Sequence, residues 1–191
     1  MAITPPPRVR VHLETPVRQL RALPEVAAHA EEYRWTSIDA WHITLAFLGE
    51  VDDRLLPELE RRMARAAARH AALRLSLAAG GAFSSRRRAR VLWVGVRGDT
   101  ERLGALARSV AAGARRAKID VDAKDRFRPH LTLARLRQPT DVTAAVETLR
   151  GYAGPRWRAP EITVIRSRLG QGPGGRAVHE PVSTYPLADE G

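Results

Sequence analysis

Apolar and polar residues alternate along several short stretches of this chain, and a period of two predicts β-strands. The alternation, or a short apolar run, occurs at residues 8–13, 41–48, 73–79, 90–96, 130–136, 160–168 and 177–186. Apolar residues with helical spacing lie between these stretches and predict helices at residues 15–33, 54–71, 100–117 and 141–150. Pro24 should break or kink the first helix.

Strands and helices alternate in both halves of the chain, and no disordered linker separates the halves. This order argues for an α/β or α+β fold rather than a helical bundle or a β-sandwich. The 191 residues are enough to bury a sizeable core without disulfides, which the absence of cysteine excludes. We therefore expect one domain, residues 1–191, built from two lobes packed together.

One strand sequence occurs twice. Residues 42–48 read HITLAFL and residues 130–136 read HLTLARL, so five of the seven positions are identical. Because side chains alternate on a strand, His42 and Thr44 should share one face while the apolar side chains out to Phe47 point into the core. Burial explains the repeated leucines, but it gives no reason to repeat a histidine and a threonine.

The second copy should present His130 and Thr132 in the same way. Two lobes related by a pseudo-twofold would bring the strands face to face, with both histidines flanking one cleft. Two imidazoles around a phosphate suit one reaction: one takes a proton from the attacking hydroxyl, and the other donates a proton to the leaving oxygen. The threonine hydroxyls can donate hydrogen bonds to the non-bridging oxygens. This scheme requires no metal and no cofactor.

Other site chemistries lack their residues. The remaining histidines, His12, His29, His70 and His179, are scattered, and the HExxH or paired cysteines of a zinc site are absent. The chain contains neither the G-x-S-x-G of a serine hydrolase nor a P-loop. The letters GQGPGG at residues 170–175 satisfy G-x-G-x-x-G, but no helix pattern follows, so we interpret them as a hairpin turn.

The chain is strongly basic, with a net charge of +11, and all of its 32 basic residues except Lys118 and Lys124 are arginine. A planar guanidinium suits phosphate oxygens, so the balance favours an anionic partner, nucleic acid above all. Codon bias and solvated helix faces explain any single arginine equally well. No stretch approaches the roughly 20 apolar residues of a membrane span. We expect a cytoplasmic, soluble monomer with no membrane partner.

Together these residues resemble the two-histidine phosphoesterases, specifically the RNA 2′,3′-cyclic phosphodiesterases that are also called 2′–5′ RNA ligases. The likeness covers nearly the whole chain, in the opening strand with PVRQL, WHITLAFLGEV, AFSSRRRARVLWVGV, FRPHLTLARL and VIRSRLGQGPGGRAVHEPVSTYPL. It implies an α+β, bilobal fold of two pseudo-symmetric lobes, each with an antiparallel sheet and helices, around a central cleft. It also implies hydrolysis of a terminal 2′,3′-cyclic phosphate on RNA, such as a tRNA fragment, to a 2′-phosphate without metal or ATP. Some members of the family also join RNA ends through a 2′–5′ linkage.

The resemblance implies roles for the motif residues. His130 would be the base that activates water, His42 the acid that protonates the departing 3′ oxygen, and Thr44 and Thr132 would hold phosphate oxygens. The motifs are nearly symmetrical, so acid and base can be exchanged. Arg135 stands where the family carries an arginine near the phosphate, although strict alternation turns it away from His130 unless the strand bulges or ends there.

Two further positions carry alternatives. Arg87, the middle of three consecutive arginines, is either a contact for the RNA backbone or part of a solvated loop. The family's first strand usually carries aromatic and small residues where this chain has Val11 and His12, and His12 either reaches the cleft or caps that strand.

Two rival functions remain open. The first is hydrolysis of a small cyclic nucleotide, of the ADP-ribose cyclic phosphate type. The second is a non-catalytic RNA-binding module that keeps the fold without turnover.

Overall fold

The structure of the chain, a computed structural model, describes residues 1–121, 127–172 and 176–189. Its α-helices are α1 (Pro7–Arg21), α2 (Pro24–Ala27), α3 (Leu56–Ala67), α4 (Thr100–Arg116) and α5 (Thr143–Thr148). Its strands are β1 (Ala2–Ile3), β2 (Tyr33–Trp35), β3 (Ile43–Thr44), β4 (Leu73–Phe83), β5 (Ala89–Gly98), β6 (His130–Thr140), β7 (Trp157–Ala159), β8 (Glu161–Gly172) and β9 (Arg176–Pro186).

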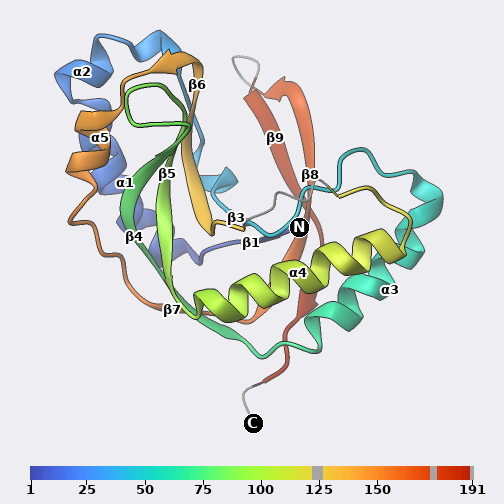
Figure 1. The fold of residues 1–191 in the computed structure, drawn as a ribbon. Coiled ribbons are helices and arrows are strands. Elements are labelled where there is room, and N and C mark those ends of the chain that lie inside the picture. Colours follow the sequence, from blue (N-terminus) through green and yellow to red (C-terminus); the bar gives the residue numbers. More distant parts are fainter. Residues whose placement is uncertain (122–126, 173–175, 190–191) are drawn as a thin grey trace.

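These nine strands form one sheet in the order β7-β4-β5-β6-β3-β1-β8-β9, with β2 paired to β6. Every strand pairing in it is antiparallel, which confirms the expected α+β class. Figure 1 shows the sheet curled, with β4, β5 and β6 as one wall and the β8–β9 hairpin as the other. The short strands β3 and β1 join the two walls at their base.

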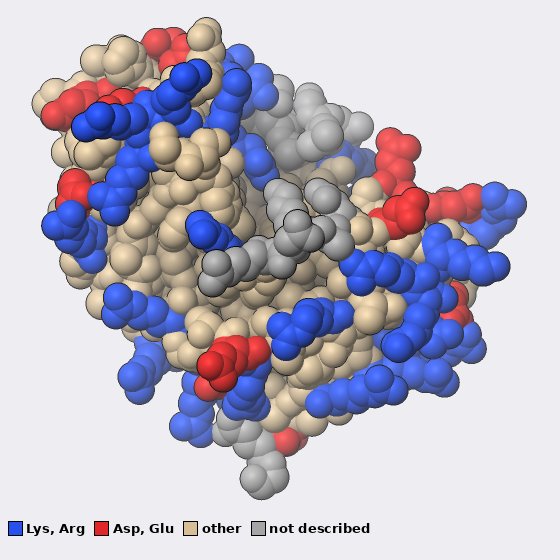
Figure 2. Space-filling view, in the orientation of Figure 1, with Lys and Arg blue, Asp and Glu red and all other residues tan. Residues whose placement is uncertain are grey.

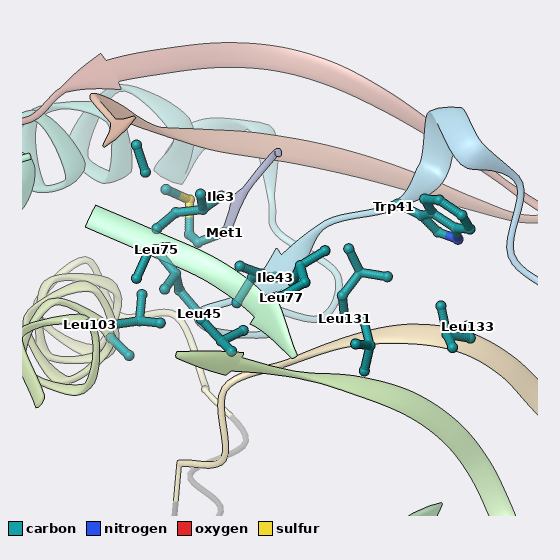
Figure 3. Close-up of a cluster of buried hydrophobic side chains, with 14 of the residues drawn as sticks. Met1, Ile3, Trp41, Ile43, Leu45, Leu75, Leu77, Leu103, Leu131 and Leu133 are labelled. Carbon is teal, nitrogen blue, oxygen red and sulfur yellow. The ribbon is translucent and has the colours of Figure 1, made fainter. Parts of the chain in front are cut away.

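Helices cover the outer sides of this curled sheet. Figure 1 shows α3 and α4 side by side along the lower front, and α1, α2 and α5 beside the wall formed by β4–β6. Helix α4 contributes Leu103 to an apolar cluster that also contains Leu45 and Leu75 (Figure 3). Ile43 and Leu131, one from each repeated motif, lie in the same cluster. The core therefore packs against the middle of the sheet, where the motifs are. None of the described helices is both long and apolar enough to cross a membrane.

The predicted strand at residues 8–13 is wrong, because these residues belong to helix α1. Alternating arginine and valine suggested a strand, but the buried residues are Val9, Leu13, Val17 and Leu20, which follow a helical spacing. Val11, which a strand would place beside Val9, is 59% exposed. The helix begins at Pro7 rather than near residue 15, and Pro16 lies inside it.

The first motif strand is shorter than the sequence pattern indicates. Only Ile43–Thr44 pairs as β3, and the backbone N–H of Leu45 then donates to the carbonyl of Met1 at 2.8 Å. Alternation stops there, so Phe47 does not share the buried face and is 54% exposed.

The helices predicted at 54–71, 100–117 and 141–150 are confirmed as α3, α4 and α5, with shorter bounds. The predicted turn at 170–175 falls partly on residues 173–175, which lie outside the described residues. Gly172 and Arg176 on either side of that segment pair with each other.

A matched pair of substitutions tests helix α1. Val9→Ala removes a buried side chain and should lower the free energy of unfolding by about 1.5–3 kcal/mol. Val11→Ala makes the same chemical change at an exposed position and should alter it by less than about 0.5 kcal/mol. Urea denaturation measures both changes. Equal losses of unfolding free energy in the two variants would contradict the helix and favour the strand predicted from the sequence.

Candidate active site

The two H-x-T motifs are neighbours because β3 and β6 pair in antiparallel fashion. The paired residues are Ile43 and Leu131, and both are fully buried. Since side chains alternate along a strand, the residues before and after each of them point to the opposite face of the sheet. The histidine and threonine of both motifs therefore lie together on the face away from the core, and all four are partly exposed.

The register sets the spacing on that face. Pairing of Ile43 with Leu131 places His42 beside Thr132 and Thr44 beside His130. Residues directly opposite each other have Cβ atoms about 4.5–5.5 Å apart, and diagonal pairs such as the two histidines are about 7–8 Å apart. One phosphate group fits between two imidazoles with that separation. The motif strands thus lie edge to edge in one sheet, whereas the sequence interpretation placed them face to face across a gap.

Both motif histidines are held by the same backbone contact. Nδ1 of His42 lies 2.8 Å from the carbonyl oxygen of Ala40, and Nδ1 of His130 lies 2.7 Å from that of Arg128. A carbonyl oxygen only accepts, so each Nδ1 carries the proton and donates it. In the neutral ring this leaves the basic lone pair on Nε2. The repeated contact therefore gives both histidines the same tautomer.

Burial sets the protonation state of His42. The loss of solvent around its ring lowers its pKa from 6.5 to about 4, and the positive charges of His179 and Arg135 act in the same direction. The hydrogen bond to Ala40 opposes this shift without cancelling it. His42 is therefore neutral at pH 7 in the ligand-free protein.

A third histidine, His179, faces this site although it belongs to neither motif. The rings of His179 and His42 lie edge to face with centroids 5.3 Å apart. His179 comes from β9, and its Nδ1 lies 2.9 Å from the hydroxyl of Ser167 on the paired strand β8. Burial, followed by the charge of Arg135, lowers the pKa of His179 as well. Its proximity to His42 arises only from the path of the sheet, because the two residues are far apart in the chain.

Two aromatic rings flank His130. The ring of Phe83 meets it edge-on with centroids 4.6 Å apart, and the ring of Trp93 lies 6.2 Å away. Gly81 makes room for the indole, because a Cβ at this position would lie 2.2 Å from the Trp93 ring. Neither aromatic was predicted as a site residue: Trp93 lies on the strand predicted at residues 90–96, whereas Phe83 lies beyond the strand predicted at 73–79, because β4 extends to Phe83.

A bulge determines where Arg135 points. Thr132 pairs with Trp93 and Ala134 with Leu92, so Leu133 is an extra residue in β6. Leu133 and Ala134 are both buried, and the alternation then resumes with opposite parity. Arg135 consequently returns to the face of the motif histidines, close enough for its charge to lower the pKa of His42 and His179.

Arg87 and His12 lie elsewhere. Arg87 is exposed in the turn between β4 and β5, where its charge helps to lower the pKa of Asp141 after the hydrogen bonds from Thr143. His12 is on helix α1, so the prediction that it caps a strand is wrong, and its Nδ1 lies 3.2 Å from the hydroxyl of Tyr152. Among the residues that the structure describes, no group of three His, Asp or Glu side chains has the arrangement of a metal site.

Known proteins are similar to this chain over most of its length. Residues 5–171, which include both motifs, match the 2′-5′ RNA ligase superfamily, and the chain belongs to that family. The RNA 2′,3′-cyclic phosphodiesterase of Geobacillus stearothermophilus is 32% identical over 155 residues, which make up 80% of this chain. The match spans 47% of that relative, so the chain covers about half of its length.

Solved structures share the fold. TT0787 of Thermus thermophilus superimposes with a TM-score of 0.76 and 25% identity, over 100% of this chain and 97% of that one. E. coli LigT complexed with 3′-AMP superimposes with a TM-score of 0.71 and 26% identity, over 97% of this chain and 94% of that one.

The lowered pKa of His42 predicts how stability depends on pH. The unfolded chain binds a proton at this residue below about pH 6.5, whereas the folded protein resists it until about pH 4. Stability should therefore fall as the pH drops through this window, by about 2–3 kcal/mol at pH 4.5 from His42 alone. Urea midpoints at pH 7 and pH 4.5 should show a smaller loss for His42→Gln than for the parent. His29→Gln, at an exposed histidine, is the control and should leave the loss unchanged; an unchanged loss in His42→Gln would contradict this account.

Proposed function

We propose that this protein hydrolyses the terminal 2′,3′-cyclic phosphate of RNA to a 2′-phosphate. The pairing of Ile43 with Leu131 carries the proposal, because it puts two H-x-T motifs on one face with their histidines in the same tautomer. Membership of the 2′-5′ RNA ligase superfamily, and a relative named as an RNA 2′,3′-cyclic phosphodiesterase, support the choice of substrate. We infer two lobes, one contributing each motif, related by a local twofold axis through that residue pair.

The reaction uses the motif residues in pairs. Nε2 of His130 takes a proton from water as the water oxygen forms a bond to phosphorus, and the bond from phosphorus to O3′ breaks. Protonated His42 donates its Nε2 proton to O3′, which leaves a free 3′ hydroxyl beside the 2′-phosphate. The hydroxyls of Thr44 and Thr132 donate hydrogen bonds to the non-bridging oxygens, whose charge grows in the transition state. No step requires a metal ion.

The substrate itself prepares His42 for its role. In the ligand-free protein His42 is neutral, and a neutral imidazole cannot donate to O3′. The negative charge of a phosphodiester within about 4–6 Å favours the protonated ring and raises its pKa. Binding of the anion therefore loads the acid, while Arg135 stabilises the phosphate charge from the same face. Ligation uses the same groups with a 5′-hydroxyl in place of water: His130 takes the proton of that hydroxyl as its oxygen bonds to phosphorus, and the bond to O3′ breaks to leave a 2′–5′ linkage and a 3′ hydroxyl.

Arg87 has a separate part in this proposal. It is exposed at the tip of the β4–β5 hairpin, away from the residues that touch the phosphate. There it is available for the RNA backbone beyond the terminal nucleotide.

Removing either motif histidine tests the proposal. An oligonucleotide that ends in a 2′,3′-cyclic phosphate should be opened to the 2′-phosphate in the presence of EDTA. His42→Ala and His130→Ala should each lower kcat by about 10²–10⁴, because each removes one proton transfer. Both variants should retain salt-sensitive RNA binding. His29→Ala serves as the control, and full turnover in either motif variant, or no ring opening by the parent, would refute the proposed function.

The pH dependence of kcat/KM reports the protonation of the free protein. Whichever histidine is the acid, catalysis needs one of the two rings protonated and the other neutral. Activity therefore falls when both rings become protonated at low pH. That acidic limb should lie near pH 4, the lowered pKa of His42, rather than near 6.5. Arg135→Gln should move the limb upward because it removes a positive charge, whereas Arg135→Lys should not. A limb at about 6.5 in the parent would rule out a buried, neutral His42 as a partner in catalysis.

A further inference from the structure

A second basic feature lies outside the candidate active site. Helices α3 and α4 enclose a groove of about 440 Å³. Five arginines line it: Arg62, Arg65, Arg69, Arg108 and Arg116. None of the described residues along this groove is acidic, and the rest of the lining is alanine, glycine and serine.

Packing between the helices builds the groove. Gly113 of α4 lies so close to α3 that a Cβ there would be 2.9 Å from the terminal methyl of Met63. Just beyond the end of α3, Nε2 of His70 lies 2.8 Å from the hydroxyl of Ser109 on α4 and ties the two segments together. The lining thus combines small side chains with five long arginine side chains. The groove is thus formed by two helices in direct contact.

The groove is separate from the motif histidines. Helix α4 turns Leu103 and Leu106 into the core, against the face of the sheet that carries Ile43. The histidines lie on the other face of that sheet. Figure 2 shows lysine and arginine side chains gathered over the region of α3 and α4.

The charges in the groove are largely uncompensated. Arg62 binds Glu58 at 2.6 Å, while no ion pair between described residues involves Arg65, Arg69, Arg108 or Arg116. Along α4, Arg108 and Arg116 are eight residues apart, which corresponds to about 12 Å of helix axis. Positive charges spread over that length match a row of phosphates better than one small anion. Guanidinium groups also suit phosphate oxygens through their paired N–H donors.

We propose that the α3–α4 groove binds the phosphate backbone of RNA at a distance from the cyclic end. The choice of RNA rests on the proposed function. A membrane surface fits less well, because an interfacial helix presents a broad apolar face to lipid. Large apolar residues of both helices are buried in the core instead: Leu59, Met63, Leu103, Leu106 and Val110.

Two double variants on the same helices distinguish RNA binding by the groove from attraction by the overall positive charge. Arg65→Ala/Arg108→Ala removes two groove arginines, and Arg61→Ala/Arg115→Ala removes two arginines that do not line the groove. Each lowers the net charge by two. The probe is a single-stranded RNA of about 20 nucleotides with a 2′-phosphate end, titrated at several salt concentrations. Turnover of a dinucleotide 2′,3′-cyclic phosphate is measured in parallel, because this substrate is too short to span both sites.

The groove variant should bind the RNA several-fold more weakly, and its slope of log affinity against log salt should fall by about 1.4, at about 0.7 for each lost phosphate contact. The control variant should keep the parent slope, and both should turn over the dinucleotide as the parent does. Arg65→Lys/Arg108→Lys retains the charge and should keep most of the salt slope. This variant shows whether the alanine variant loses RNA binding through lost charge or through misfolding.

Three outcomes would contradict RNA binding by the groove. They are an equal loss of RNA affinity in the groove and control variants, an unchanged salt slope of RNA affinity in the groove variant, and a groove variant that loses binding to phosphatidylserine vesicles but keeps RNA binding. A parent protein that binds RNA through the groove but never opens the dinucleotide ring would instead contradict the proposed function alone.

Discussion

The site depends on one backbone pairing at the centre of the molecule, between Ile43 of β3 and Leu131 of β6. Each of these residues is fully buried, and together they turn the flanking histidines and threonines to the opposite face. β3 contains only two residues, so its position comes from its neighbours, with β1 on one side and β6 on the other. A shift of one residue in this register would turn every motif side chain into the core.

The same packing determines the electrostatics of the site. Burial, which gives the core its stability, also removes solvent from His42 and lowers its pKa to about 4. The bulge at Leu133 then returns Arg135 to the histidine face, where its positive charge acts in the same direction. A protein with these features disfavours a positive charge on His42 until an anion is bound. In the proposed mechanism, protonation of His42 is thus linked to occupancy of the site.

Much of this arrangement follows from the sequence, and the exceptions have physical causes. A repeated H-x-T within apolar residues predicts two strands with a polar pair on one face, which β3 and β6 have. Alternating arginine and valine around Val9 has the period of a strand, but the residues that are buried, Val9, Leu13 and Val17, recur every four positions as in a helix. The side on which Arg135 lies depended on a bulge that has no local signal. The approach of His179 to His42 depends on sheet topology, which no short stretch of sequence encodes.

The most direct test of the account is a crystal structure of the protein bound to a nucleoside 2′-phosphate. We expect the phosphate between the motif strands, with Nε2 of His42 and of His130 each within about 2.6–3.2 Å of one of its oxygens. The hydroxyls of Thr44 and Thr132 should donate to other oxygens of the same group. A phosphate that contacts only one of the two histidines, or that binds elsewhere on the protein, would contradict the shared site.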